Sequence, residues 1–403
     1  MKSNLFAVLS LGLTVLMAMS IGPAQAQGPA TRYTVTDLGT LGGFFNQATL
    51  LNNHGMVSGL SSLPNGTQHA VLWANGNLVD IGSTLNLGGP NSGAFGINEK
   101  GQVDGVAENA TPDPNNENFC GYFTGLECRP FRWQDGVMTE LPLLGGNNGT
   151  VGQINNRGEV AGIAENSTRD PDCPSAPAAN GTGPHVLDFE AVIWGPQDGV
   201  RQLSPLPGDT VGMNLWINDS GQAVGTSGTC ANTVLPPFAV GPHAVLWEKD
   251  GSVTNLGNLG GTANPALLGI GNVALAINNR SQVTGVSTLA DNSHIHAFLW
   301  TKETGMQDLG TLPGDVNSGG LGTNNQGDIV GASINGDAAT GSPRAILWHN
   351  GVMTDLNSLA PDSPLYLLTA FGINDAGQIV GFGASATGEI HGFLATPVHS
   401  ADF

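Results

Sequence analysis

The segment HAFLWTKETGMQDLGTLPGDVNSGGLGTNNQGDIVG, residues 296–331, contains three short phrases that recur along the chain. One phrase ends in Trp, as in HAFLW (296–300), and another ends in Asp-Leu, as in MQDL (306–309). The third runs from an Asn through a Gly turn to an apolar residue and Gly, as in TNNQGDIVG (323–331). Self-similarity with a period of roughly 50 residues is typical of propellers and other repeat proteins, so this segment decides the fold.

The phrase with the Asn turn occurs seven times. Its copies are LNNHGMVSG (51–59), INEKGQVDG (97–105), INNRGEVAG (154–162), INDSGQAVG (217–225), INNRSQVTG (277–285), TNNQGDIVG (323–331) and INDAGQIVG (373–381). The Trp phrase has six copies, and the seventh, HGFLA (391–395), has lost its Trp. Asn-Gly or Asp-Gly follows five of the six Trp phrases, and such a pair between alternating apolar runs is a strong hairpin signal. Each repeat therefore predicts four short strands.

We name these strands a (ending in Ile-Asn), b (Val-Gly), c (ending in Trp) and d (ending in Asp-Leu). The a–b and c–d links are tight, whereas the link from d to the next a is longer and rich in Gly, as a crossover between blades should be. The chain opens with YTVTDLG (33–39), a d strand with no repeat before it, and closes with a, b and c strands alone. We therefore predict an all-β, seven-bladed β-propeller of four-stranded antiparallel blades, closed by the N-terminal strand pairing into the last blade.

The combination of HAFLW, DLGTLGG and INxxGQVVG resembles the HAF-repeat family of extracellular bacterial proteins. The resemblance covers residues 33–396, and it implies export and a repeat fold. It transfers no reaction, catalytic residue or cofactor to this chain.

The N-terminus has the features of a secretory signal peptide over residues 1–26. A positive start is followed by the apolar run Phe6 to Ile21 and by small residues that favour cleavage near Ala26. We expect a single propeller domain over 27–403. The mature protein should be secreted or periplasmic, should not span a membrane, and should be a monomer. Acidic residues outnumber basic ones by 32 to 12, which argues against nucleic acid as a partner.

The b–c links of three adjacent repeats carry insertions, at 106–128, 163–189 and 226–242, and all four cysteines lie in them. An even number of cysteines in an exported chain predicts disulfides. We predict that these form within the first insertion and between the other two: Cys120–Cys128 and Cys173–Cys230. Because b–c and d–a links share one face of a propeller, the insertions form a wall on that face, where we expect a ligand.

Several polar residues recur for reasons that need no ligand. His69, His243, His296 and His391 begin c strands, where we expect hydrogen bonds at strand edges or between blades. The pair His294 and His296 lacks a third metal ligand. The repeated turn asparagines fit Asx turns that bind their own backbone; they are Asn98, Asn155, Asn218, Asn278, Asn324 and Asn374.

Three residues are our candidate ligand contacts. Trp216 lies outside the c-strand position, two residues before a turn Asn, where it could approach the central channel and stack on a ligand. Asp209 and Asp315 lie in Pro-Gly-Asp crossovers, which we expect near the mouth that carries the insertions. No cofactor is predicted, with one alternative: Glu108, Asp113 and Glu117 provide oxygen ligands of the kind that calcium prefers, without the spacing of a helix-flanked calcium loop.

No nucleophile elbow, zinc-protease motif or nucleotide-binding motif occurs in the sequence. The sequence therefore favours a secreted, non-catalytic binding or interaction protein whose extracellular ligand is a glycan or a protein. Two alternatives remain: a glycan-acting enzyme that uses carboxylates at the same face, and a structural envelope or matrix protein. Propellers host many functions, so the fold does not choose among the three.

Overall fold

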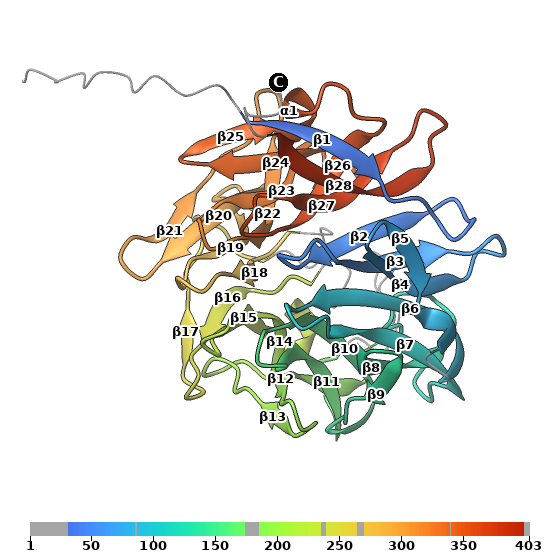
Figure 1. The fold of residues 1–403 in the computed structure, drawn as a ribbon. Coiled ribbons are helices and arrows are strands. Elements are labelled where there is room, and N and C mark those ends of the chain that lie inside the picture. The colour runs from blue at the N-terminus through green and yellow to red at the C-terminus, as the bar shows by residue number, and fades with distance from the viewer. Residues whose placement is uncertain are drawn as a thin grey trace, which may run out of the picture.

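The computed structural model describes residues 31–84, 87–173, 185–234, 239–263, 270–338 and 340–398, and these form a closed ring of seven four-stranded blades (Figure 1). The predicted signal peptide lies outside these ranges. Every blade is an antiparallel meander in the order a-b-c-d from the axis outward. The predicted fold class is confirmed.

The a and b strands are joined by the Asn-x-x-Gly turns, with Ser281 in place of the Gly in blade 5. The a strands are β2 (Asn46–Leu51), β6 (Gly88–Ile97), β10 (Gly145–Ile154), β14 (Val211–Ile217), β18 (Val273–Ile277), β22 (Asn317–Thr323) and β26 (Tyr366–Ile373). The b strands are β3 (Val57–Ser62), β7 (Val103–Pro112), β11 (Val160–Arg169), β15 (Ala223–Gly228), β19 (Val283–Thr288), β23 (Ile329–Asn335) and β27 (Ile379–Ala384).

The c and d strands form the outer half of each blade. The c strands are β4 (Gln68–Ala74), β8 (Leu126–Gln134), β12 (Leu187–Trp194), β16 (His243–Trp247), β20 (Ile295–Thr301), β24 (Ser342–His349) and β28 (Ile390–Val398). The d strands are β5 (Asn77–Asp80), β9 (Val137–Glu140), β13 (Val200–Gln202), β17 (Val253–Asn255), β21 (Gly305–Asp308), β25 (Val352–Asp355) and, for the last blade, β1 (Arg32–Asp37). Helical turns are confined to η1 (Gly82–Thr84), η2 (Cys230–Asn232) and α1 (Leu356–Leu359) among the described residues.

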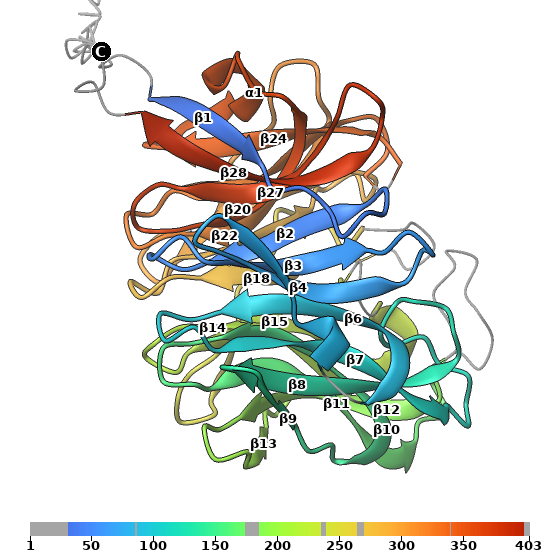
Figure 2. The ribbon, with the colours of Figure 1, turned by 45° about the vertical axis from the view of Figure 1, so that its right-hand side comes forward.

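The ring closes as predicted, because β1 pairs antiparallel with β28 over its whole length, from Arg32 opposite Val398 to Asp37 opposite Phe393. Figure 2 shows the blue first strand lying against the red last strand. The seventh c strand reaches Ala395 where other copies have Trp, and its outer neighbour is a strand from the other end of the chain. Closure leaves β28 with no unpaired edge.

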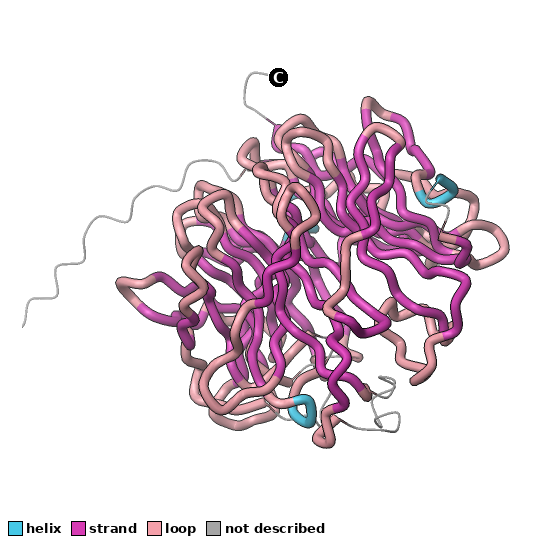
Figure 3. The backbone as a smooth tube through the Cα atoms, turned by 90° about the horizontal axis from the view of Figure 1, so that it is seen from below, coloured by secondary structure: helices cyan, strands magenta, loops and turns pink. Residues whose placement is uncertain are grey.

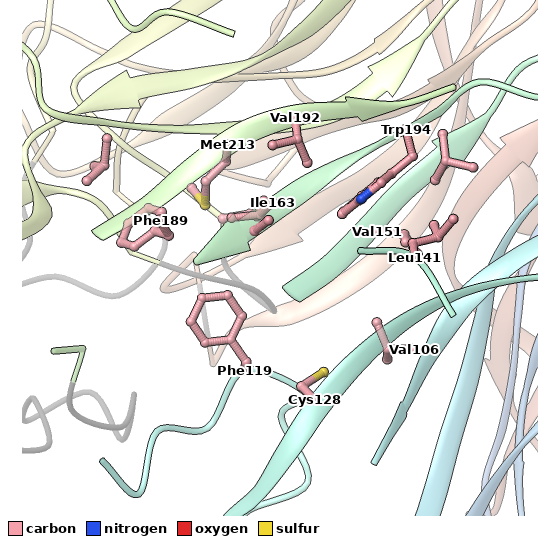
Figure 4. Close-up of a cluster of buried hydrophobic side chains, with 14 of the residues drawn as sticks. Val106, Phe119, Cys128, Leu141, Val151, Ile163, Phe189, Val192, Trp194 and Met213 are labelled. Carbon is pink, nitrogen blue, oxygen red and sulfur yellow. The ribbon is translucent and has the colours of Figure 1, made fainter. Parts of the chain in front are cut away.

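The blades pack through their c strands, whose side chains are buried on both faces. Trp73, Trp194 and Trp247 each donate an indole hydrogen bond of 2.6–2.7 Å to a carbonyl of the crossover that enters their own blade. These tryptophans therefore fasten one blade to the next. In Figure 4, Trp194 and Val192 of β12 lie with residues of blades 2 and 4 in a shared apolar core.

A Gly closes each Val-Gly phrase for a steric reason. At Gly285 of β19, an added Cβ would lie 2.0 Å from the carbonyl oxygen of Val273, and at Gly331 of β23 it would lie 1.9 Å from that of Gly319. Each of these contacts is next to a register shift in the a strand, between Ala274 and Ala276 in blade 5. The bulged inner strand approaches the b strand so closely that no side chain fits.

Candidate functional site

The turn asparagines form a closed ring around the central axis. The side-chain amide of each one donates to the backbone carbonyl of the equivalent Asn in the next blade, and the last blade donates to the first, over 2.8–3.2 Å. The ring members are Asn52, Asn98, Asn155, Asn218, Asn278, Asn324 and Asn374. Figure 3 shows the backbone at 90° to the view of Figure 1, with the strands in magenta and the loops and turns that join them in pink.

The predicted Asx turns are also confirmed, within each ring member. The Oδ1 atom of Asn278, for example, accepts from the backbone N–H groups of Arg280 and Gln282, both at 3.0 Å. Each Asn therefore holds its own turn and the neighbouring blade at once. The bond between blades was not predicted.

The next residue in each turn builds a second closed ring nearer to solvent. Each backbone N–H donates to the side chain of the equivalent residue in the following blade over 2.9–3.2 Å. The members of this outer ring are Asn53, Glu99, Asn156, Asp219, Asn279, Asn325 and Asp375. Three of the seven are therefore carboxylates, in blades 2, 4 and 7.

These two rings surround a cavity of about 310 Å³ at the mouth of the channel, and all seven blades contribute to its lining. The lining holds the outer-ring carboxylates, ring amides, aliphatic residues, Gln153 and Trp216. It contains no His, Ser, Cys, Lys or Arg among the described residues.

Trp216 lines this cavity, as its position before the turn Asn suggested. Its partly buried indole packs against the apolar core of blades 4 and 5 and against that of blades 1 and 2. Blade 1 lies across the axis from β14 of blade 4, so a side chain that reaches its core extends over the channel. Four of the equivalent positions carry only Gly or Ala, which leaves room for it; they are Gly96, Ala276, Gly322 and Gly372.

Asp209 and Asp315 do not join Trp216. Both lie in d–a crossovers, at the end of the blades opposite to the a–b turns. Asp209 accepts from Ser227 at 2.7 Å and lies 3.0 Å from the His243 ring nitrogen. Asp315, whose side chain is 1 % exposed, forms a 2.8 Å ion pair with Arg344. Both carboxylates are thus held within the framework, on the face that carries the insertions.

The repeated histidines lie at strand edges, as predicted, and most of them contact the end of the neighbouring d strand. His69 pairs with Asp80 at 2.9 Å and His296 with Asp308 at 2.8 Å. His391 pairs with Asp37 at 2.8 Å, so the same contact joins the two chain ends in blade 7.

The insertions are held by both predicted disulfides, Cys120–Cys128 and Cys173–Cys230, with Cα atoms 5.3 and 4.8 Å apart. Part of the predicted insertion length proved to be strand, because β7 continues to Pro112 and β8 resumes at Leu126. Hydrogen bonding across this extended ladder satisfies backbone groups that a loop would leave exposed.

The three calcium candidates are engaged by protein groups. Glu108 accepts from Asn91 at 2.8 Å and also from Thr124. Asp113 accepts from the backbone N–H of Glu117 at 2.8 Å. Across the described ranges, three metal-binding side chains approach within 4.8 Å of one another only at a different place, formed by Asp170, Cys173 and Cys230. Both sulfurs of that group belong to the second disulfide.

A buried carboxyl pair joins the insertion of blade 2 to blade 3. Glu117 and Glu165 are 1 % and 0 % exposed. Glu117 accepts from the backbone N–H of Val186, and Glu165 accepts from that of Asn148 at 2.8 Å. Burial, and then the Glu117 charge, raise the pKa of Glu165 to about 9; burial likewise raises the pKa of Glu117. Burial therefore favours the protonated form of Glu165 at neutral pH.

His185 lies beside this pair without a hydrogen-bond partner on either ring nitrogen. Its ring makes edge contacts with Phe119 and Phe189, at centroid distances of 6.3 and 6.1 Å, and Figure 4 shows these two phenyl rings on opposite sides of the interface between blades. Burial lowers the pKa of His185 to about 4. The imidazole is thus neutral and contributes to the apolar core.

The sequence matches no family model and no curated protein. Solved structures with the same architecture are similar to this chain at very low sequence identity. A streptogramin B lyase structure shares 9 % identity at a TM-score of 0.49, over 91 % of this chain and 98 % of that one. An acylaminoacyl peptidase from Pyrococcus horikoshii shares 9 % identity at a TM-score of 0.50, over 88 % of this chain and 52 % of that one. The similarity to the peptidase indicates the propeller fold alone.

Proposed function

We propose that the protein is an exported, non-catalytic binding protein that holds a small polar ligand in the cavity formed by the a–b turns. The observation that carries this proposal is the polar cavity itself, built from all seven blades and lined on one side by Trp216. Binding sites for small molecules are typically concave and preformed, with a few polar groups that fix orientation. The two hydrogen-bonded rings provide such a preformed rim.

The cavity is suited to binding rather than to glycan cleavage. Its three outer-ring carboxylates, Glu99, Asp219 and Asp375, come from blades that are not adjacent. Each already accepts hydrogen bonds from a neighbouring turn. A glycosidase needs two carboxyl groups at a defined separation, one of them protonated. The carboxyl pair with a raised pKa, Glu117 and Glu165, is buried elsewhere and does not line this cavity.

We place the ligand on the face of the propeller that carries the a–b turns, which we call the turn face. The sequence had led us to expect it on the opposite face, which carries the insertions. The described parts of the insertions direct their acidic groups toward one another and toward backbone N–H groups. Trp216 lies at the other mouth. We therefore place the proposed site there and assign the insertions a stabilising role.

Export is supported by the signal-like N-terminus and by two disulfides, which persist in oxidising compartments. Among the described residues, no helix has the length and apolar character needed to cross a membrane. We also propose that the chain is related to the HAF-repeat family, which its repeat phrases resemble and which implies export.

The experiment is a ligand screen on the mature chain, 27–403, with monosaccharides, amino acids, amines and short carboxylic acids, read by saturation-transfer NMR. Hydrogen exchange with each hit then locates the site. We expect protection of the turns at 52–56, 98–102 and 218–222. Protection confined to 106–128 and 163–173 would place the ligand on the insertion face instead, and a complete absence of hits would favour a structural role.

A further inference from the structure

The backbone N–H donors at the rim of the turn-face cavity are already used within the fold. All seven outer-ring backbone N–H groups already donate to the next blade. All seven inner-ring amides donate to the carbonyl of the neighbouring Asn. A ligand that accepts hydrogen bonds from this rim is therefore limited to the side-chain N–H groups that the rings leave over.

Hydrogen-bond acceptors, by contrast, remain in excess. Each carboxylate oxygen has two lone-pair directions, and Asp375 Oδ2, for example, accepts one hydrogen bond, from Asn325. Gln153 lines the same cavity, and its side-chain oxygen is buried without any donor. An acceptor buried in this way costs stability unless a ligand supplies its hydrogen. The cavity therefore leaves carboxylate and amide oxygens that a ligand with N–H groups can satisfy.

The three carboxylates are not required by the turns that contain them. The equivalent outer-ring residue is Asn in four blades, and those copies make the same backbone bond, as Asn279 does with Asp219 at 2.9 Å. For this backbone bond a neutral Asn would therefore serve at Glu99, Asp219 and Asp375. The carboxylates accept, in addition, side-chain amides of neighbouring outer-ring Asn residues. Placing three negative charges around one cavity adds mutual repulsion that the framework does not need.

Basic groups near the rim do not neutralise the cavity lining. Arg157 is turned toward Glu159, and Arg280 donates to the carbonyl of Gln326. His54 lies 3.7 Å from Glu99, but it is largely exposed to solvent and does not line the cavity. The cavity thus combines negative charge, free acceptors and one indole.

We infer that the ligand of this cavity is an organic ammonium ion, bound by the carboxylates at the rim and by the indole of Trp216; this rests on the function proposed above. Aromatic faces attract organic cations, and the interaction strengthens when the cation is shielded from water. A bare metal ion fits less well, because the outer-ring carboxylates are not among the described groups whose oxygens converge within 4.8 Å. An extended amine can instead contact carboxylates in different blades.

The test uses isothermal titration of the mature protein with putrescine and choline, and with glucose, acetate and calcium chloride as the other probes. We expect an amine to bind, more weakly as sodium chloride is raised. D219N should weaken amine binding about tenfold, because it removes a charged hydrogen-bond acceptor and keeps the Asn that other blades use. W216L should weaken it by roughly 2- to 30-fold.

D135N is the matched control. Asp135 lies in the c–d turn of blade 2, on the same face, at a position where other repeats have Asn with the same positive φ. It should leave affinity unchanged, since Asp135 does not line the cavity.

Other outcomes separate this inference from the proposed function. Glucose binding that depends on Trp216, without amine binding, would overturn the ammonium inference and leave the binding function standing. Calcium binding that D219N abolishes, without amine binding, would also overturn it. Amine binding with equal affinity in wild type, D219N and W216L would refute the site itself.

Discussion

Replacing one inner-ring Asn should destabilise the whole propeller. Asn278 is 5 % exposed and makes four side-chain hydrogen bonds: two accepted from its own turn, one donated to Gln282, and one donated to the carbonyl of Asn324 at 2.8 Å. In N278A, water can replace the lost hydrogen bond to Gln282. The loss of the other three hydrogen bonds should therefore lower the stability. At about 1 kcal/mol for each, we expect the free energy of unfolding to fall by about 3 kcal/mol.

The aspartate variant gives a sharper test of the donor. N278D keeps both accepted bonds but places a carboxylate against the carbonyl of Asn324, so it should be at least as destabilised as N278A at neutral pH. Protonation restores a donor, and the stability of N278D relative to wild type should therefore recover as the pH falls. The measurement is urea unfolding followed by Trp fluorescence, with the midpoint compared at an unchanged slope.

The matched control is N279A in the outer ring. Asn279 is exposed and its side chain exchanges hydrogen bonds only with Asp219, so its loss should cost less than about 1 kcal/mol. If N278A and N279A were equally stable within about 0.5 kcal/mol, the inner ring would not hold the blades together and our reasoning would be refuted.

Three further outcomes are expected. Deleting residues 31–38 should lower the melting temperature and promote association through the exposed edge of the last blade; an unchanged melting curve would rule out a stabilising closure. Because the folded pKa of Glu165 is raised to about 9, its contribution to stability should be fully present below the unfolded pKa and be lost as the pH rises toward 9. E165Q, which can donate to Glu117, should therefore show a weaker fall in stability over this range in pH-dependent urea titrations. The pair C173A/C230A opens a loop with a sequence separation of 57 and should cost about 4 kcal/mol, against about 2.5 kcal/mol for the shorter loop in blade 2; equal losses on denaturation would contradict the loop-entropy account.

The fold was predictable because every blade repeats the same local signals. Asn-Gly turns, Trp-ended strands and the unmatched d strand at 33–39 each constrain neighbours in sequence, and together they specify seven blades and their closure. The disulfide pairing followed from the same order, since adjacent insertions must lie on adjacent blades. These predictions needed only local patterns and the connectivity of a propeller.

The site was less predictable because it depends on contacts between repeats. Asn155 and Asn218 are 63 residues apart, and no local pattern distinguishes an Asn that only holds its turn from one that also binds the next blade. Asp209 and Asp315 were placed on the correct crossovers, but sequence did not show that His243 and Arg344 engage them.

One available signal was overlooked. Aligning the residue after each turn Asn gives a column in which Asn alternates with Glu99, Asp219 and Asp375. A charge that appears in only some copies of a repeat is not demanded by the repeat. Such a column points to the cavity that the structure contains.

The inner Asn ring also bears on how the number of blades is set. Each amide donates in the same rotational sense, and the seventh bond, from Asn374 to Asn52, is of the same kind as the other six. A closed ring of hydrogen bonds has no first or last member. Its donors and acceptors therefore do not determine the number of blades. Six or eight identical turns could close the same ring, so the number seven must be set by the packing between blades. Duplicating one blade should therefore test the packing of the c strands rather than the hydrogen bonds at the axis.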